Sequence, residues 1–250
     1  MDTASRQIIV GNWKMNGVTT DLAEIEKVAW EIADCPGEVV ICPPTTLLHA
    51  AARMTAGSRL LLGAQDCSEQ AEGAFTGDIS ARMIVDCRGR FVILGHSERR
   101  QYHGETDLLV RRKAEIALNA GLAPVICIGE TETERLSQET LAVLTKQLRD
   151  GLPEDLNDGR LIIAYEPLWA IGTGRIPDYD EIIAAHSAIR HALVGTYGPS
   201  GSKVPILYGG SVKPENAAQI LCLENVDGVL VGGASLRAGT FLQICNAVAQ

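Results

Sequence analysis

The chain has 250 residues, of which 46% are apolar and 21% charged, and its formal net charge is -9 at pH 7. This length can bury a sizeable core without disulfides. The acidic balance argues against nucleic-acid partners and anionic membrane surfaces, because both require a basic protein surface. No apolar run approaches the length of a membrane span, and the first residues, MDTASRQ, contain no signal-peptide core.

Eight short apolar runs recur along the chain, rich in Val and Ile and with little polar alternation, as expected of strands covered on both faces. We predict these strands at Ile8–Val10, Val39–Cys42, Arg59–Leu62, Phe91–Leu94, Pro124–Ile128, Leu161–Tyr165, Val204–Tyr208 and Gly228–Val231. Apolar residues at helical spacing predict helices over Leu22–Ala33, Thr106–Asn119, Thr140–Leu148 and Tyr179–Leu193, the second with a basic face of Arg111, Arg112 and Lys113.

Buried strands that alternate with helices predict a closed (β/α)8 barrel of eight parallel strands with an outer ring of helices. No linker or composition shift marks a boundary, so we expect a single domain over residues 1–250. A doubly wound open sheet is the alternative, but it usually carries GxGxxG after its first strand, where this chain has GNWKMNG. In a barrel the chemistry belongs at the C-terminal ends of the strands, and the unusual motifs of this sequence follow such ends.

The segment GNWKMNG, after the first strand, holds Asn12 and Lys14. A lysine at a strand end is often merely solvated. Lys14, however, directly follows Trp13 and lies between Gly11 and Gly17, which is a poor place for a generic surface lysine. We interpret it as a fixed cation for a bound anion, next to an asparagine donor.

The segment LGHSERR, after the fourth strand, places His96 directly before an expected helix start, with Ser97 near the cap. A helix N-terminus carries partial positive charge, which disfavours the imidazolium form. A neutral imidazole there can donate a hydrogen bond to a developing oxyanion. Glu98 is expected to position Lys14 or His96, and Arg99 to form a structural ion pair.

The segment AYEPLWAIGTGR, after the sixth strand, begins with Glu166 at the end of an apolar run. A carboxylate there is costly unless it is hydrogen-bonded or functional. The residues that follow have proline at one end, Gly-Thr-Gly at the other and an apolar middle, which is typical of a hinged lid. We predict that this lid comprises Pro167, Leu168, Trp169, Ala170, Ile171, Gly172, Thr173, Gly174 and Arg175.

The segments YGGSVKPEN and LVGGASL follow the last two strands and contain Gly209–Gly210–Ser211 and Gly232–Gly233. One Gly-Gly pair usually marks only a turn. Two pairs at neighbouring strand ends, each leading into a helix, leave backbone amides accessible for a phosphate group.

Together GNWKMNG, GHSERR, AYEPLWAIGTG, YGGSV and VGGASL resemble the signature segments of the triosephosphate isomerase family, in order over nearly the whole chain. The resemblance implies a glycolytic and gluconeogenic enzyme that interconverts dihydroxyacetone phosphate and D-glyceraldehyde 3-phosphate through an enediol(ate). Glu166 would be the base and His96 the neutral electrophile, helped by Asn12, while Lys14 would bind the substrate anion. The family is a standard example of an enzyme that adjusts the pKa values of its base and its electrophile. The roles of Glu166 and His96 are therefore implied by the resemblance.

The resemblance also implies that amides of Gly172, Ser211, Gly232 and Gly233 hold the phosphate. Ile171 and Leu230 would press on Glu166 and dehydrate it. The residues expected to support the site are Ser97, Glu98, Cys127, Tyr208 and Leu230. No metal or organic cofactor is implied.

Members of the family are generally homodimers in which the loop after the third strand reaches the partner subunit. In this chain that loop reads GAQDCSEQAEGAFTGD, so Phe75, Thr76 and Gly77 would face the partner. Asp66 replaces a common Asn, Asp78 a common Glu, and Arg175 a common Lys. The shorter acid at Asp78 is expected to weaken a pairing with Arg99.

Seven cysteines are scattered along the chain, with no CxxC pair and no metal-ligand spacing. We expect reduced and mostly buried thiols in a cytoplasmic protein, and no metal site.

Two other functions remain open at this point. One is a barrel aldolase that uses Lys14 as a Schiff-base amine, although this leaves Glu166 without a role. The other is a non-catalytic phosphosugar-binding protein, against which the intact set of Asn12, Lys14, His96 and Glu166 argues.

Overall fold

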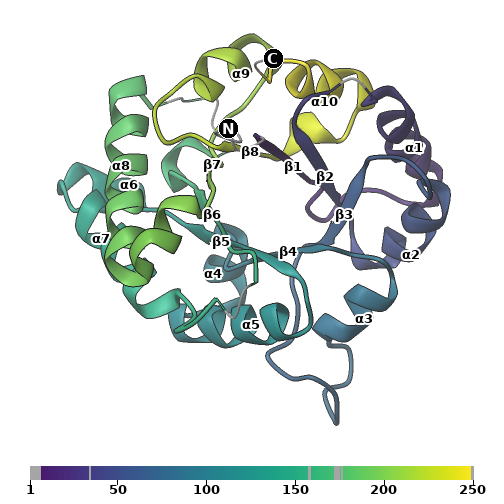
Figure 1. The fold of residues 1–250 in the computed structure, drawn as a ribbon, viewed down its shortest axis with the longest axis horizontal. Coiled ribbons are helices and arrows are strands. Elements are labelled where there is room, and N and C mark those ends of the chain that lie inside the picture. The colour runs from purple at the N-terminus through teal and green to yellow at the C-terminus, as the bar shows by residue number, and fades with distance from the viewer. Residues whose placement is uncertain (1–6, 34, 157–158, 172–174, 176, 249–250) are drawn as a thin grey trace.

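The protein is described here from a computed structural model that covers residues 7–33, 35–156, 159–171, 175 and 177–248. Its eight strands close into one barrel in chain order (Figure 1). They are β1 (Ile8–Asn12), β2 (Glu38–Cys42), β3 (Leu61–Ala64), β4 (Phe91–Leu94), β5 (Ala123–Ile128), β6 (Ile162–Tyr165), β7 (Ile206–Tyr208) and β8 (Gly228–Val231). Strand β1 pairs in parallel with both β2 and β8, which closes the barrel and confirms the predicted fold class.

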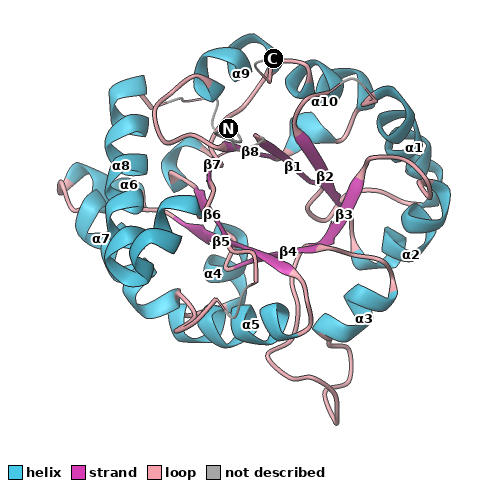
Figure 2. Ribbon diagram, in the orientation of Figure 1, coloured by secondary structure: helices cyan, strands magenta, loops and turns pink. Residues whose placement is uncertain are grey.

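The helices form an outer ring around the strands (Figure 2). They are α1 (Leu22–Glu31), α2 (Thr45–Met54), α3 (Ala81–Asp86), α4 (Ser97–His103), α5 (Asp107–Asn119), α6 (Glu132–Leu136), α7 (Thr140–Gly151), α8 (Tyr179–Tyr197), α9 (Pro214–Leu221) and α10 (Ala238–Cys245). Short 3-10 turns add η1 (Thr19–Asp21), η2 (Leu168–Ala170), η3 (Gly198–Lys203) and η4 (Gly233–Ser235). All four helices predicted over specific ranges are present, and the expectation of a single domain stays a prediction.

Alternate residues of each strand face two different apolar layers. Ile8 and Val10 of β1 join the cluster inside the barrel, together with Ile93 and Leu207 from other strands. Ile9 instead packs in the outer layer, between the strands and the helices. Both faces are therefore apolar, which explains why the strands read as continuous apolar runs.

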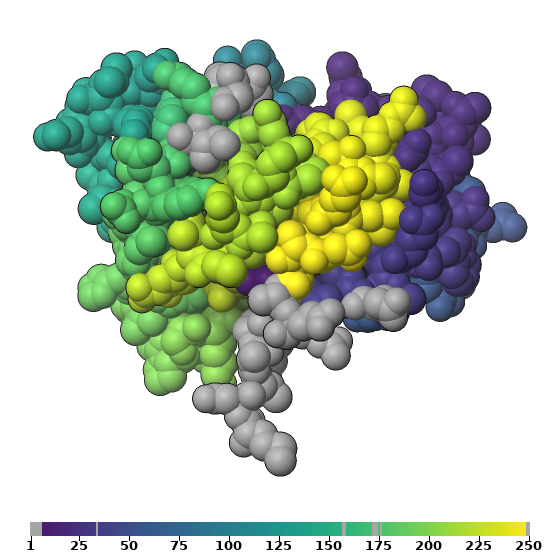
Figure 3. Space-filling view, turned by 90° about the horizontal axis from the view of Figure 1, so that it is seen from above, coloured from purple at the N-terminus to yellow at the C-terminus, as the bar shows by residue number. Residues whose placement is uncertain are grey.

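The first and last helices meet on the outside of the barrel, where α10 lies beside α1 (Figure 3). The carboxylate of Glu24 in α1 accepts a 2.7 Å hydrogen bond from the backbone N–H of Ala238, at the start of α10. It also lies 3.0 Å from the guanidinium of Arg237. This contact holds the outer ring closed where the two ends of the chain meet. Within the described residues, no helix combines the length and the apolar character needed to cross a membrane.

The loop between β3 and α3 projects away from the barrel (Figure 1). Asp66, at the start of this loop, belongs to a partly buried ion cluster. Lys113 lies 2.8 Å from Asp66 and 2.5 Å from Glu105, and Arg99 lies 2.8 Å from Asp66 and 2.6 Å from Glu105. The predicted basic face of α5 is therefore wrong for Lys113, which is buried. Two carboxylates from outside the helix compensate its charge.

Among the described residues Asp78 forms no ion pair with Arg99, which is in the direction of the expected weakening of that pairing. Asp78 instead accepts a 2.6 Å hydrogen bond from the hydroxyl of Ser68 inside the loop. Asp66 forms an ion pair with the guanidinium of Arg99. Both Asp66 and Asp78 depart from the family pattern, and it is Asp66 that contacts Arg99.

Candidate active site

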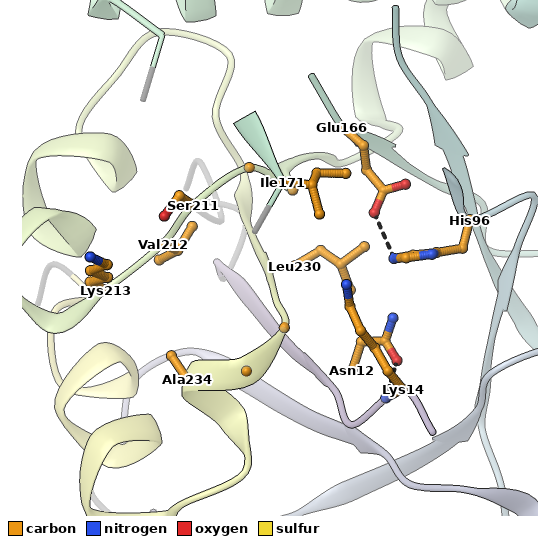
Figure 4. A pocket seen from close by; sticks show the side chains of 14 residues that line it. Asn12, Lys14, His96, Glu166, Ile171, Ser211, Val212, Lys213, Leu230 and Ala234 are labelled. Carbon is orange, nitrogen blue, oxygen red and sulfur yellow. Dashed lines mark hydrogen bonds and ion pairs between the residues drawn. The ribbon is translucent and has the colours of Figure 1, made fainter. Parts of the chain in front are cut away.

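A cavity opens at the C-terminal ends of the strands, where the sequence motifs place chemistry (Figure 4). Residues from the ends of β1, β4, β6, β7 and β8 meet there, and they come from all four motif groups. The described lining consists of Asn12, Lys14, His96, Glu166, Ile171, Gly209, Gly210, Ser211, Val212, Lys213, Leu230, Gly232, Gly233 and Ala234. The structure thus brings together the predicted base, electrophile, cation and glycine turns.

The carboxylate of Glu166 is almost completely buried and both of its oxygens have partners. Oε1 lies 3.0 Å from Nε2 of His96, and Oε2 accepts a 3.0 Å hydrogen bond from the backbone N–H of Ser97. Ser97 is the first residue of α4, so this amide belongs to the positive end of a helix. The buried charge of Glu166 is therefore compensated by donors from a single helix start.

His96 is oriented by the same helix start. Its Nδ1 accepts a 3.3 Å hydrogen bond from the backbone N–H of Glu98. In the neutral tautomer that fits this contact, the proton is on Nε2 and points to Glu166. The ring can therefore donate from Nε2 to whatever oxygen occupies the carboxylate's place.

Glu166 and His96 shift each other's pKa. Burial lowers the pKa of His96, but attraction to ionised Glu166 outweighs it, and the net shift is upward. Burial raises the pKa of Glu166, but His96 and the Ser97 amide outweigh it, and the net shift is downward. The ion-pair contact with Glu166 thus raises the pKa of His96, although the helix N-terminus alone was expected to lower it. Once the carboxylate leaves the ring, burial and the helix terminus remain, and both favour neutral imidazole.

Lys14 is held by contacts at both ends of the residue. Its backbone, at the left-handed φ of 52°, donates a 2.9 Å hydrogen bond to Oδ1 of Asn12. Its Nζ lies 2.7 Å from Oε1 of Glu98. Glu98 was expected to position either Lys14 or His96, and this contact matches the first of these two roles. A Cβ at Gly232 would lie 3.4 Å from Cε of Lys14, so the ammonium stem rests against the turn after β8. The neighbouring Trp13 is buried and donates to the carbonyl of Ser235, which ties β1 to that turn.

The two glycine turns both line the cavity, and the first of them touches the stem of Glu166 through Gly209. Gly210 must lack a side chain, because a Cβ there would lie 2.1 Å from the hydroxyl of Tyr208. A Cβ at Gly233 would meet nothing within 4 Å, which shows that its backbone borders open space. Ser211, Gly232 and Gly233 line this part of the cavity, so the phosphate-binding role of their amides stays a prediction, and Gly172 lies outside the described residues.

Residues behind the cavity fix the stem of Glu166. A Cβ at Gly209 would lie 2.9 Å from Cγ of Glu166 and 3.7 Å from Cβ of Leu230. Leu230 and Ile171 both line the cavity beside the carboxylate (Figure 4). Cys127 is completely buried, and burial together with ionised Glu166 raises the pKa of its thiol well above the ordinary value. The thiol of Cys127 is therefore an uncharged packing group.

The first half of the predicted lid begins close to Glu130, a fully buried carboxylate that the motifs did not identify. Its Oε1 accepts hydrogen bonds from the indole of Trp169, at 2.9 Å, and from the hydroxyl of Tyr165, at 3.2 Å. The guanidinium of Arg135 lies 4.0 Å above the ring of Trp169. Arg175 donates a 3.1 Å hydrogen bond to the Trp169 carbonyl, which links the two ends of the lid.

Three predicted lid residues, Gly172, Thr173 and Gly174, lie outside the described residues. Pro167 and η2 connect Glu166 to Ile171. Gly129, before this hinge, has to be glycine, since a Cβ there would lie 1.7 Å from the carbonyl oxygen of Glu166. The close approach lets β5 support the residue that carries the carboxylate, where the Glu166 N–H donates to the Ile128 carbonyl at 2.7 Å.

Comparison with known proteins agrees with this geometry. Residues 7–248 match the family model described as triosephosphate isomerase. The chain belongs to the triosephosphate isomerase family. A triosephosphate isomerase of Xanthobacter flavus is 51% identical over 99% of this chain and 100% of its own length, and one of Rhizobium meliloti is 48% identical over 97% and 96%. The crystal structure of the triosephosphate isomerase of Bartonella henselae superposes with a TM-score of 0.89, at 43% identity over 97% of this chain and 98% of that chain.

Family membership leaves two parts of the sequence prediction for this chain open. Phe75, Thr76 and Gly77 lie exposed in the projecting loop, which suits contact with a partner subunit, and this contact stays a prediction. Across the described residues, no group of three or more His, Cys, Asp or Glu side chains is arranged to hold a metal ion. Five of the seven cysteines are buried, as expected, whereas Cys87 is partly exposed and Cys222 exposed.

Sequence reasoning did not assign Lys213, Val212, Ala234 or Glu130 to the site. Lys213 and Val212 stand inside the motif YGGSVKPEN, so their position after β7 was the available signal. Glu130 could have been suspected from its place two residues after β5, by the same argument that identified Glu166.

Proposed function

We propose that this chain interconverts dihydroxyacetone phosphate and D-glyceraldehyde 3-phosphate, with Glu166 as the base and His96 as the electrophile. One observation carries the proposal: a buried carboxylate lies 3.0 Å from a histidine Nε2 in a cavity that two glycine turns also line. A base, an oxyanion donor and an anion site are the three elements that proton transfer next to a carbonyl requires.

The phosphate of the substrate would bind at the turns after β7 and β8, against the amides of Ser211, Gly232 and Gly233 and near the ammonium of Lys14. This anchors one end of the three-carbon chain. The carbonyl oxygen would then lie near Nε2 of His96 and the side-chain amide of Asn12, which both line the cavity on the side of Glu166.

Glu166 would give up its contact with His96 and take a proton from C1 of dihydroxyacetone phosphate. The C–H electron pair becomes the C1–C2 double bond, and the carbonyl oxygen gains negative charge that His96 stabilises by its hydrogen bond. Proton movement between the two oxygens and return of the proton from Glu166 to C2 give the aldehyde. No net oxidation occurs, because C2 is reduced as C1 is oxidised.

Ile171 and Leu230 would exclude water from Glu166 when the lid covers the substrate. A carboxylate without water is a stronger base, because the charged form loses its solvation. The lid would also retain the enediolate, which eliminates phosphate when it is exposed to water.

The structure argues against the aldolase alternative. A Schiff base needs a free amine, whereas Nζ of Lys14 is ion-paired with Glu98 at 2.7 Å. Borohydride reduction in the presence of dihydroxyacetone phosphate should leave Lys14 unmodified. A covalent adduct on Lys14 would replace the isomerase proposal with the aldolase one.

The deciding experiment is a coupled assay that detects glyceraldehyde 3-phosphate formed from dihydroxyacetone phosphate by the purified protein. We expect turnover by the wild type and almost none by Glu166→Gln. A folded wild-type protein that binds phosphate analogues without turnover would instead be a phosphosugar-binding protein.

We also propose that the chain works as a cytoplasmic homodimer. Exposed apolar side chains support the dimer, because Met15, after β1, is 96% exposed and Phe75, in the projecting loop, is 46% exposed. Thiols without disulfide partners in the described chain support a reducing compartment. Light scattering tests the dimer: Phe75→Glu should lower the measured mass to that of one chain, and an unchanged mass would count against this loop as the contact.

A further inference from the structure

The cations around the cavity differ in how their charge is compensated. Lys14 is ion-paired with Glu98, and Glu166 adds a further negative charge inside the cavity. Lys213 also lines the cavity, and no carboxylate of the described chain lies within ion-pair distance of it. Without Lys213, the charged groups at the cavity therefore carry net negative charge. That balance is unfavourable for a substrate with a phosphate dianion.

We propose that Lys213 is a second phosphate cation, which draws the substrate's phosphate dianion into the cavity and helps to hold it at the glycine turns. The inference rests on the proposed function, which supplies the phosphorylated substrate. Lys213 is a binding residue in this account and takes no part in the proton transfer.

The backbone at Lys213 is fixed next to the proposed phosphate position. The side chain of Asn216 accepts a 2.8 Å hydrogen bond from the Lys213 N–H and donates a 3.1 Å hydrogen bond to the Ser211 carbonyl. One side chain thus sets the geometry of both residues at the start of α9. Figure 4 shows Lys213 beside Val212 and Ser211, on the other side of the cavity from Lys14. In that view Ser211 lies between Lys213 and Lys14, so a phosphate bound at this turn would have a lysine on either side.

The exposure of Lys213 determines which kinetic step it can affect. A solvated ammonium acts over a distance of several ångströms and is screened by salt. It raises the rate of encounter with an anion and weakly stabilises the bound anion, but it does not change charge at the reacting carbons. Lys213 should therefore act on kcat/KM and on phosphate binding, and leave kcat unchanged.

Lys203 provides a matched control. It is also an exposed lysine flanking β7, but it ends η3, which precedes the strand, whereas Lys213 follows the strand. Lys203→Glu changes the net charge of the protein by the same amount as Lys213→Glu, without placing the change at the cavity. Any difference between the two variants is therefore due to position and not to total charge.

The test measures kcat and KM for dihydroxyacetone phosphate in Lys213→Glu, Lys213→Gln, Lys213→Arg and Lys203→Glu. At about 10 mM salt we expect Lys213→Glu to lower kcat/KM about fivefold, and at about 500 mM salt less than about twofold, because salt shortens the range of the field. Lys213→Gln should show a smaller loss, and Lys213→Arg and Lys203→Glu almost none. The inhibition constant of inorganic phosphate should rise in parallel with the loss.

Turnover of unphosphorylated glyceraldehyde separates the charge effect from structural damage. This substrate has no dianion, so Lys213→Glu should convert it as the wild type does. A loss that is equal for both substrates, that does not change with salt, or that Lys203→Glu reproduces would overturn the assignment.

Failure of the proposed function would give a different result. In that case the wild type would not convert dihydroxyacetone phosphate at all, and binding of inorganic phosphate to the wild type and Lys213→Glu could be compared directly by calorimetry. Weaker, salt-sensitive binding to the variant would support Lys213 as a phosphate cation even then, and equal binding would refute it.

Discussion

Two buried histidines of this protein have opposite electrostatic surroundings. His96 lies at the end of β4, borders the cavity and contacts the ionised carboxylate of Glu166 at 3.0 Å. His186 lies within α8, is fully buried, and packs edge-on against the ring of Tyr165 at a centroid distance of 5.9 Å. Its Nδ1 lies 2.9 Å from the Asn225 carbonyl, and burial lowers its pKa to about 4.

The comparison shows that burial alone does not mark a functional histidine. His186 is neutral near pH 7, because burial outweighs the favourable contact of its ring with the Asn225 carbonyl, so it can serve only in packing. His96 borders open space and contacts the carboxylate of Glu166, which raises the pKa of the ring. A charged carboxylate that contacts the ring beside a cavity, and not burial of the imidazole, is therefore what distinguishes His96 from His186.

The largest effect should come from removing that carboxylate. Glu166→Gln keeps the shape and the hydrogen bond from Ser97 but removes the proton acceptor, so we expect kcat to fall by about three powers of ten or more. Binding of a phosphate analogue should be retained. Steady-state kinetics and calorimetry measure the two quantities, and a parallel loss of binding would mean that Glu166 is not the base.

A smaller loss is expected when His96 is changed. An amide can still donate to the developing oxyanion, so His96→Gln should lower kcat by about two powers of ten, less than Glu166→Gln. Side-by-side kinetics of the two variants test this ranking. A larger loss in His96→Gln would make the histidine, and not the carboxylate, the centre of the reaction.

His186 should affect stability and leave catalysis unchanged. Its folded pKa, about 4, lies below the ordinary value of 6.5, so between these values the unfolded chain binds a proton that the folded chain does not. Wild-type stability should therefore fall as the pH drops from 6.5 to 4, by up to about 3 kcal/mol from this group at about 1.4 kcal/mol per pH unit.

Urea unfolding at several pH values compares the wild type with His186→Gln, which has no proton to gain. The variant should show a shallower decline over that range, with kcat within about twofold of the wild type. An identical pH dependence of the two proteins would show that His186 is not the neutral packing group described here.

The smallest effect should be seen at Asp78, whose side chain accepts a hydrogen bond from Ser68 and forms no ion pair among the described residues. Asp78→Asn keeps an acceptor for the Ser68 hydroxyl and breaks no ion pair, so it should cost less than about 1 kcal/mol. Asp66→Asn weakens contacts to both Lys113 and Arg99 in the partly buried ion cluster and should cost about 2 kcal/mol or more. Thermal unfolding of the two variants tests the order, and a larger loss at Asp78 would reverse the assignment of the ion cluster.

The barrel, and the meeting of Asn12, Lys14, His96 and Glu166 at one cavity, were predictable from the sequence because both depend on local signals. Strands covered on both faces read as apolar runs, and polar residues directly after them are conspicuous. The same signal separates His96, which follows β4, from His186, which stands inside a helical pattern and gives no sign of function.

Contacts between elements were not predictable in this way. Lys113 looked like part of an exposed basic face, because the spacing within α5 cannot show that Asp66 and Glu105 approach from other segments. The partner of Asp78 depended on the path of the loop, and the burial of Glu130 depended on the indole of Trp169 folding over it. For each of these three side chains, the sequence did not show which distant charge or hydrogen-bond donor would compensate it.

The most direct test of the central claim follows hydrogen at carbon by NMR while the wild type converts dihydroxyacetone phosphate in heavy water. If Glu166 removes the proton to form an enediolate, the proton on the carboxylate can exchange with solvent, and the account predicts glyceraldehyde 3-phosphate that carries solvent deuterium at C2. Product that retains only hydrogen from the substrate at C2 would indicate direct hydride transfer, and it would contradict a role for Glu166 as the base.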